Sequence, residues 1–452
     1  MSGFALRVDE RADDTDAVLR RLVEDRVAER LAAKDHTLWG PEAESEASIR
    51  LGWVDLPVRS RSLLAEIEAL QAELRQEGLD HIVLAGMGGS SLAPEVVTRT
   101  AGVELTVLDT TDPGVVRRAL ADRLDRTVVV VSSKSGSTVE TDSQRRAYLR
   151  AFDEAGIDGR RRIVVVTDPG SPLAELATEE GYRRVFLADP NVGGRYSALS
   201  AFGLVPSALA GADIAELLDD AEAVLQSLAT PGEQNPALAI GAVLGAAHAA
   251  GKEKVVIGTG SSTVTGFAAW AEQLIAESTG KNGRGLLPVD VGGTSSDTPG
   301  WLTTSDATYV SIGAPESGTA DIVVDGPLGT LFQVWETAIA VAGRVIDINP
   351  FDQPNVEAAK KQARALLDDP GSGDGLPHAF TEGPVEVYGT PEVLGGRRTL
   401  EGLVGSLRSL APANGYLSLQ AYLDRDADAD VEQLRPLVAA SSGLQTTFGW
   451  GP

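Results

Sequence analysis

The segment 127-TVVVVSSKSGSTVETDSQ-144 joins a continuous run of β-branched residues to a loop rich in serine and threonine. An unbroken run of valines is typical of a strand buried on both faces, as in a parallel sheet covered by helices. The loop contains one cation, Lys134, surrounded by hydroxyl groups. A cluster of small donors with one positive charge suits a phosphate group. The segment therefore predicts a strand, an anion-binding loop and a helix in succession.

The same order of strand, glycine and serine loop, and helix occurs twice more, in 81-HIVLAGMGGSSLAPEVV-97 and 254-KVVIGTGSSTVTGFAAWAEQ-273. Short apolar runs at 105–108, 163–166 and 309–312 predict further strands. We therefore predict an α/β protein with two lobes, each a parallel sheet between helical layers. The expected divisions are an N-terminal helical segment (1–74), a first lobe with the phosphate loops (75–212), a helical linker (213–250), a second lobe (251–366) and a C-terminal module (367–452).

Composition excludes several classes of function. The net charge of −26 argues against nucleic acid and against anionic membrane surfaces, both of which attract basic proteins. The chain has no cysteine, so it forms no disulfide and no thiolate metal site. No signal peptide is evident at the N-terminus, and no apolar run approaches the roughly 18 residues of a membrane span. We expect a soluble, cytoplasmic protein.

Three common motifs fail on inspection. Ser91 stands where a dinucleotide fold needs its third glycine, and Ile275 stands where a P-loop needs its first. No Gly-x-Ser-x-Gly elbow occurs, and no paired histidines indicate a metal. These motifs are therefore set aside. Taken singly, each serine-rich loop is equally compatible with simple helix capping.

Two charged residues are unusual as plain structure. Arg195 follows two glycines in 192-VGGRYSALSAFGLVP-206, where the backbone can be approached closely. Glu277 stands where an apolar helix is predicted to end, and a carboxylate there is disfavoured by the helix dipole. A solvated helix-end glutamate is the plain structural alternative; a functional carboxylate is the other.

Five motifs in order resemble the glucose-6-phosphate isomerase family over about residues 82–367. They are Gly88-Gly89-Ser90, Ser133-Lys134-Ser135, Gly193-Gly194-Arg195-Tyr196-Ser197, Glu277-Ser278-Thr279-Gly280-Lys281 and the segment 351-FDQPNVEAAK-360. The match is closest to the isomerase part that occurs alone or fused to transaldolase in some bacteria. The resemblance implies two sugar-isomerase (SIS) lobes, a sugar phosphate substrate, no cofactor, and a homodimer with a shared active site acting in glycolysis and gluconeogenesis.

The resemblance also implies roles for individual residues. Glu277 would be the base that moves a proton between C1 and C2 through a cis-enediol, Arg195 would stabilise the negative intermediate, and Lys360 would help to open the sugar ring. The expected phosphate ligands are Ser90, Ser133, Lys134, Ser135, Thr138 and Gln353. Gly88, Gly89 and Gly194 would form the substrate loop.

One departure concerns the histidine that the family uses for ring opening. The chain has His36, His81, His248 and His378, and none lies in a matching motif. The resemblance places that histidine in a later segment, so we expect it beyond residue 452, in a longer chain that continues past 448-FGWGP-452. Two alternatives stay open: a non-catalytic SIS-type regulator that binds phosphosugars, and an isomerase that also accepts mannose 6-phosphate.

Overall fold

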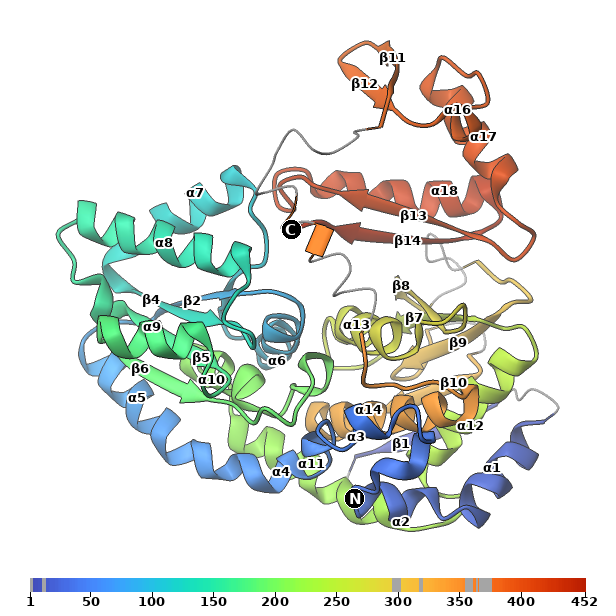
Figure 1. Ribbon diagram of the computed structural model, residues 1–452, viewed down its shortest axis with the longest axis horizontal. Helices are drawn as coiled ribbons and strands as arrows, with labels where there is room; N and C mark the ends of the chain where they lie inside the picture. The colour runs from blue at the N-terminus through green and yellow to red at the C-terminus, as the bar shows by residue number, and fades with distance from the viewer. Residues whose placement is uncertain are drawn as a thin grey trace.

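The computed structural model describes residues 3–9, 14–294, 302–316, 320–353, 361–362, 365 and 376–452. Two five-stranded sheets lie side by side, with the C-terminal module adjoining both (Figure 1). The predicted fold class, two α/β lobes with helices on both faces of each sheet, is confirmed. None of the described helices combines the length and apolar character that a membrane crossing requires.

The first lobe is built on five parallel strands in the order β3-β2-β4-β5-β6. Along β4, Val128 and Val130 enter one core, whereas Val129 and Val131 enter a second core with Tyr148. Helices therefore cover both faces, as the valine run predicts. The elements are β2 (His81–Gly86), β3 (Thr106–Leu108), β4 (Thr127–Ser132), β5 (Ile163–Thr167), β6 (Arg184–Leu187), α6 (Leu92–Ala101), α7 (Pro113–Ala121), α8 (Val139–Glu154), α9 (Pro172–Glu180) and α10 (Ala201–Ala210).

The second sheet has the order β1-β10-β9-β7-β8, and only β1 runs antiparallel to its neighbour. The predicted helical segment 1–74 thus also supplies an edge strand to the second lobe, in register from Ala5 opposite Asp325. Four residues are too few to show a period. The elements are β1 (Ala5–Val8), β7 (Lys254–Thr259), β8 (Leu287–Gly293), β9 (Ala307–Ile312), β10 (Ile322–Asp325), α11 (Ile214–Ala229), α12 (Pro236–Ala249), α13 (Phe267–Thr279) and α14 (Leu328–Ile346).

Short helices of the N-terminal segment pack beneath both lobes (Figure 1). They are α1 (Thr15–Glu24), α2 (Val27–Ala32), α3 (Glu44–Ala47), α4 (Leu56–Arg59) and α5 (Leu64–Gln76). The 3-10 turns are η1 (His36–Trp39), η2 (Gly52–Asp55), η3 (Ser60–Leu63), η4 (Gly88–Ser90), η5 (Leu124–Arg126), η6 (Gly159–Arg162), η7 (Gly194–Tyr196) and η8 (Ala429–Gln433).

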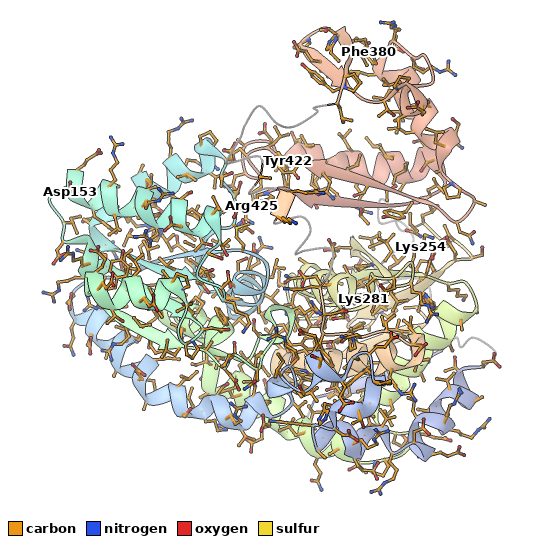
Figure 2. All side chains as sticks on the ribbon, in the orientation of Figure 1. Asp153, Lys254, Lys281, Phe380, Tyr422 and Arg425 are labelled. Atoms are coloured by element: carbon orange, nitrogen blue, oxygen red, sulfur yellow. The ribbon has the colours of Figure 1, made fainter. Side chains whose placement is uncertain are left out.

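The C-terminal module holds a hairpin and a βαβ unit. Its elements are β11 (His378–Glu382), β12 (Val385–Tyr388), α16 (Pro391–Leu394), α17 (Leu400–Leu410), β13 (Tyr416–Ala421), α18 (Leu434–Ser442) and β14 (Gln445–Trp450). Asp424 accepts from Arg118 of the first lobe at 2.7 Å, and the carbonyl of Asn414 accepts from Lys254 of the second at 2.6 Å. Arg425 lies beside the first lobe (Figure 2). The module therefore joins the two lobes.

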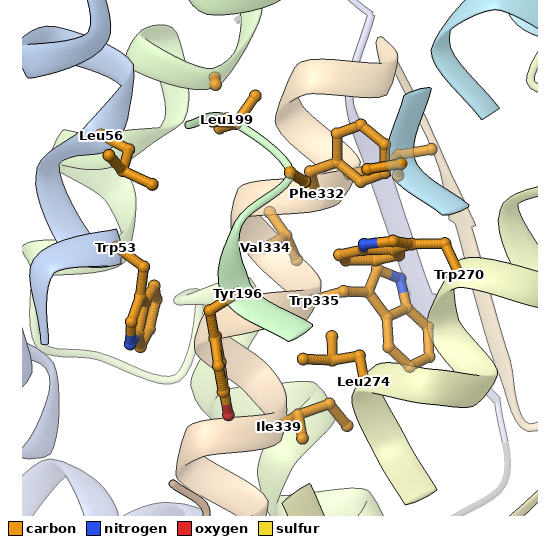
Figure 3. Packing of buried hydrophobic residues seen from close by; sticks show 14 of the residues in the cluster. Trp53, Leu56, Tyr196, Leu199, Trp270, Leu274, Phe332, Val334, Trp335 and Ile339 are labelled. Carbon is orange, nitrogen blue, oxygen red and sulfur yellow. The ribbon is translucent and has the colours of Figure 1, made fainter. Parts of the chain in front are cut away.

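An aromatic cluster supports the loop that carries Arg195. Trp53 of η2 stacks on Tyr196 with ring centroids 4.9 Å apart, and α14 passes behind them (Figure 3). The Tyr196 hydroxyl lies 3.2 Å from Ser278 Oγ at the end of α13. Burial raises the pKa of Tyr196 to about 12. The ring thus fixes η7 against both the N-terminal segment and the second lobe.

Glu336 on α14 carries a carboxyl group that is buried away from water. Its side chain is fully buried, and neither oxygen has a hydrogen-bond partner among the described residues. Burial raises the pKa of Glu336 well above its ordinary value of 4.5, so the native protein holds a proton that the unfolded chain releases above that pH.

Replacing Glu336 with methionine tests the free-energy cost of burying this carboxyl group. An apolar side chain of similar size has no polar group to desolvate, so we expect Glu336→Met to raise the free energy of unfolding at pH 8 by about 1–3 kcal/mol. The parent should lose stability as the pH rises from 4.5 towards the raised pKa of Glu336. The variant should lack this part of the pH dependence. Denaturant unfolding at several pH values measures both. A Glu336→Met protein with the parent's pH dependence would contradict the assignment.

Candidate active site

The glycine loop after β2 lies directly against the loop that carries Arg195. A Cβ atom added to Gly89 would stand 2.2 Å from the carbonyl oxygen of Gly194, so the two backbones touch. Ser197 Oγ also donates to the Gly89 carbonyl at 3.1 Å. Gly88 adopts a φ of 54°, in the left-handed region that favours glycine. The predicted substrate-loop residues Gly88, Gly89 and Gly194 are therefore brought together.

Arg195 joins the two lobes through Glu277. Its Nη1 lies 3.2 Å from Glu277 Oε2, and the arginine side chain is 4% exposed, against 28% for the glutamate. Gln273, one turn earlier on α13, donates to Glu277 Oε1 at 2.9 Å. Glu277 does lie in the last turn of α13, where the dipole disfavours a carboxylate. The guanidinium and the amide compensate for that position.

The two lobes contribute residues to the candidate site from different ends of their strands. The loops of the first lobe follow β2 and β4, at the carboxyl ends of parallel strands, as the sequence predicts. The matching loop of the second lobe follows β7 and leads to the N-terminus of α13, whereas Glu277 lies near the C-terminus of that helix. Ser261 of this loop donates to Ala314 O at 3.3 Å within its own lobe. The third sequence repeat is thus a structural copy, and only the end of its helix reaches Arg195.

The hydroxyl-rich loop after β4 is organised by its own side chains. Ser133 Oγ lies 2.9 Å from Thr138 Oγ1, and Ser135 Oγ lies 3.0 Å from Ser137 Oγ. Helix α8 begins directly after Thr138. Hydroxyls at a helix N-terminus favour an anion. A cavity of about 210 Å³ adjoins the loop, lined by Val131, Ser133, Gly136, Thr138, Thr141, Asp142, Pro172, Leu173 and Leu176. It borders the loop and not the Arg195–Glu277 pair.

Lys134 has an ionic partner that sequence reasoning missed. Its ammonium lies 2.5 Å from Oδ2 of Asp168, the residue directly after β5, and donates to the Pro190 carbonyl at 3.3 Å. Burial raises the pKa of Asp168, and Lys134 opposes that shift. The loop therefore carries less net positive charge than its sequence indicates. The bond to Pro190 also ties the loop to the segment that leads to Arg195.

The remaining predicted residues are less well defined. Ser90 is buried at the end of η4, Gln353 is exposed, and Lys360 lies outside the described residues. His81 bonds Thr127 Oγ1 at 2.8 Å and Thr106 Oγ1 at 3.0 Å, so both ring nitrogens serve contacts within the first lobe.

One group among the described residues has the spacing of metal ligands, His81, Glu104 and Asp122. Arg123 binds both carboxylates, Glu104 at 3.0 Å and Asp122 at 2.8 Å. Both nitrogens of His81 contact threonine hydroxyls. These contacts explain the cluster as an ion-pair network.

Two α/β lobes joined by an arginine–carboxylate pair, with a hydroxyl-rich loop at a helix N-terminus of the first lobe, define a two-lobed α/β protein of the sugar-isomerase type. The sequence model of the family described as phosphoglucose isomerase matches residues 61–292. A probable glucose-6-phosphate isomerase of Natronomonas pharaonis is 31% identical, over 82% of this chain and 95% of its own. A glucose-6-phosphate isomerase of Symbiobacterium thermophilum is 30% identical, over 71% and 87%. The chain belongs to the phosphoglucose isomerase family.

Solved structures support the same architecture. A hypothetical protein from Thermus thermophilus superposes with a TM-score of 0.66 at 27% identity, over 80% of this chain and 100% of its own. A glucose-6-phosphate isomerase from Chlamydia trachomatis has a TM-score of 0.68 at 20% identity, over 83% and 90%. The second likeness concerns the fold alone.

The contact between Gly89 and Gly194 makes Gly89 intolerant of a side chain. We expect Gly89→Ala to lower the free energy of unfolding by about 1–3 kcal/mol, since the methyl group must displace a backbone carbonyl. Gly193→Ala is the matched control, because its Cβ would meet only Tyr196 Cδ2, at an ordinary 3.8 Å. Chemical denaturation compares the two. Equal stability of both variants would mean that the loops do not touch in solution.

Proposed function

We propose that this protein interconverts glucose 6-phosphate and fructose 6-phosphate, with Glu277 as the base. The observation that carries the proposal is the Arg195–Glu277 pair, 3.2 Å apart across the two lobes. Membership of the phosphoglucose isomerase family supports the substrate. A non-catalytic phosphosugar sensor would need the hydroxyl loop but would have no use for this pair.

Moving a carbonyl between C1 and C2 requires removal of a proton from one carbon and its return to the next. One carboxylate beside both carbons can perform both transfers through a cis-enediol intermediate. Glu277 suits that role because Gln273 holds one oxygen and Arg195 approaches the other. Its side chain also keeps some exposure, as a group that meets substrate must.

Arg195 would stabilise the negative charge that develops on the enediolate oxygen. A guanidinium fixed before the reaction stabilises that charge with little reorganisation. Two backbone carbonyls, of Pro350 and Asp352, each accept from Arg195 Nη2 at 2.8 Å. The cation is thus anchored from one side, and Nη1 faces Glu277.

The phosphate would bind to the hydroxyls of the first lobe. Ser90, Ser133, Ser135 and Thr138 would donate, together with backbone amides at the start of α8. Lys134 would contribute as part of an ion pair with Asp168. Remote binding of this kind positions the reacting carbons. By the family motif, Gln353 would lie near the phosphate and Lys360 near the ring oxygen. The reaction as proposed needs no cofactor.

We further propose a homodimer whose subunits complete each other's site, as the family resemblance implies. Light scattering of the purified chain tests the oligomeric state. Use of mannose 6-phosphate is the remaining alternative, and a coupled turnover assay with that substrate decides it.

Glu277→Gln tests the base. The amide keeps the shape but cannot accept a proton, so kcat for fructose 6-phosphate should fall at least about 100-fold in a coupled assay. Glu272→Gln makes the same change five residues earlier on α13 and should leave kcat within about twofold. Burial and the neighbouring Asp290 raise the pKa of Glu272 to about 7. Turnover by Glu277→Gln at the parent rate would reject Glu277 as the base.

Thr138→Val tests the phosphate loop. The substitution removes a hydroxyl while keeping the shape, and a hydrogen bond to a charged group contributes about 1.5–3 kcal/mol. We therefore expect KM for fructose 6-phosphate to rise at least about tenfold, with a smaller effect on kcat. Inhibition by inorganic phosphate should weaken in parallel. An unchanged KM would remove Thr138 from the site.

A further inference from the structure

Lys281 is a buried cation just beyond the end of α13. Its side chain is 1% exposed, yet its ammonium donates three hydrogen bonds. The acceptors are Asn349 O at 2.8 Å, Asp352 O at 2.8 Å and Asp352 Oδ1 at 2.6 Å. An ammonium group has three protons, so these contacts use its whole capacity. All three bonds end on one turn, residues 349–352. Figure 2 labels Lys281 within the second lobe.

The same turn also holds Arg195. The guanidinium donates through Nη2 to the carbonyls of Pro350 and Asp352, both at 2.8 Å. The Asp352 carbonyl thus accepts from Lys281 and from Arg195. Through Nη1 the same guanidinium reaches Glu277, four residues before Lys281. The turn is therefore the common support of the two cations.

This arrangement is electrostatically expensive. Burial lowers the pKa of Lys281, the bond to Asp352 opposes that shift, and the nearby charge of Arg195 adds to it. For stability alone, an apolar residue in place of a buried ion pair is often as good or better. The pair does, however, balance the charges. With Lys281 bound to Asp352, the Glu277 carboxylate has Arg195 as its cation.

We infer that Lys281 and Asp352 form a positioning pair that fixes the 349–352 turn and so aims the Arg195 guanidinium at Glu277. The inference rests on the proposed isomerase function. The Asp352 backbone carbonyl accepts from Arg195, and the Asp352 carboxylate accepts from Lys281. If the Lys281 ammonium is removed, the Asp352 carboxylate loses its ionic partner. That carboxylate then competes with Glu277 for Arg195. The hydroxyl-rich phosphate loop lies on the other lobe; of the proposed phosphate ligands, only Gln353 is next to the turn in the sequence.

The positioning role predicts an effect on turnover and little effect on binding. Lys281→Met should lower kcat for fructose 6-phosphate about 10- to 100-fold, the range expected when a catalytic group is displaced by about 1 Å. KM should change less than about threefold. Adding Asp352→Asn removes the competing carboxylate, so the double variant should recover at least part of the lost kcat.

Lys254 offers a matched control. Its side chain is also 1% exposed and lies 2.6 Å from Asp306 Oδ2, in the same lobe and outside the Arg195 network. Lys254→Met should therefore lower the melting temperature by an amount similar to Lys281→Met, while kcat stays within about twofold. All assays are run at a temperature at which each variant is folded. If Lys281→Met does not fold, Asp352→Asn tests the pair from the other side and should lower kcat with KM retained.

The outcomes are distinguishable. A parent protein that does not turn over fructose 6-phosphate would overturn the proposed function, and the positioning role with it. An active parent whose Lys281→Met and Lys254→Met variants have the same kcat would overturn the positioning role alone. So would a loss of kcat in Lys281→Met matched by an equal rise in KM.

Discussion

The organising constraint of this molecule is a guanidinium that lies almost entirely out of water. A buried charge is stabilised by hydrogen bonds to its donors and by a nearby opposite charge. Arg195 has both from distant parts of the chain: Nη1 faces the Glu277 carboxylate and Nη2 donates to the carbonyls of Pro350 and Asp352, while its buried Nε has no partner among the described residues. The two lobes must therefore hold one relative position, because Arg195 comes from the first lobe and all of these partners come from the second.

The elements around that constraint act as its supports. Trp53 holds the Tyr196 ring, and Tyr196 reaches Ser278 beside the carboxylate. The contact of Gly89 with Gly194 sets the distance between the first sheet and the arginine loop. Close packing of α12 on α14 is of the same kind, since a Cβ on Gly241 would stand 2.6 Å from Val341 Cγ1. Small residues are needed wherever backbone must approach backbone or a branched side chain.

The sequence allowed prediction of features that depend on short, continuous segments. The valine runs indicated the parallel strands, and the ordered motifs identified Arg195 and Glu277, which the structure brings together. It missed the partner of Lys134, because the run that ends at Asp168 shows a strand but not which strand lies beside it. It missed the role of the 349–352 turn for the same reason. Pairings between distant segments depend on topology, which composition and periodicity do not contain.

The edge strand β1 has a consequence for how the polypeptide matures. β1 pairs with β10, and almost the whole of both lobes lies between them in the sequence. During synthesis the second sheet therefore keeps an open edge until β10 has left the ribosome and β1 has returned to it, a closure of high contact order. An unpaired edge is a template for joining other chains. The nascent protein thus exposes the edge of β10 in that interval, until β1 becomes the outer strand of the sheet.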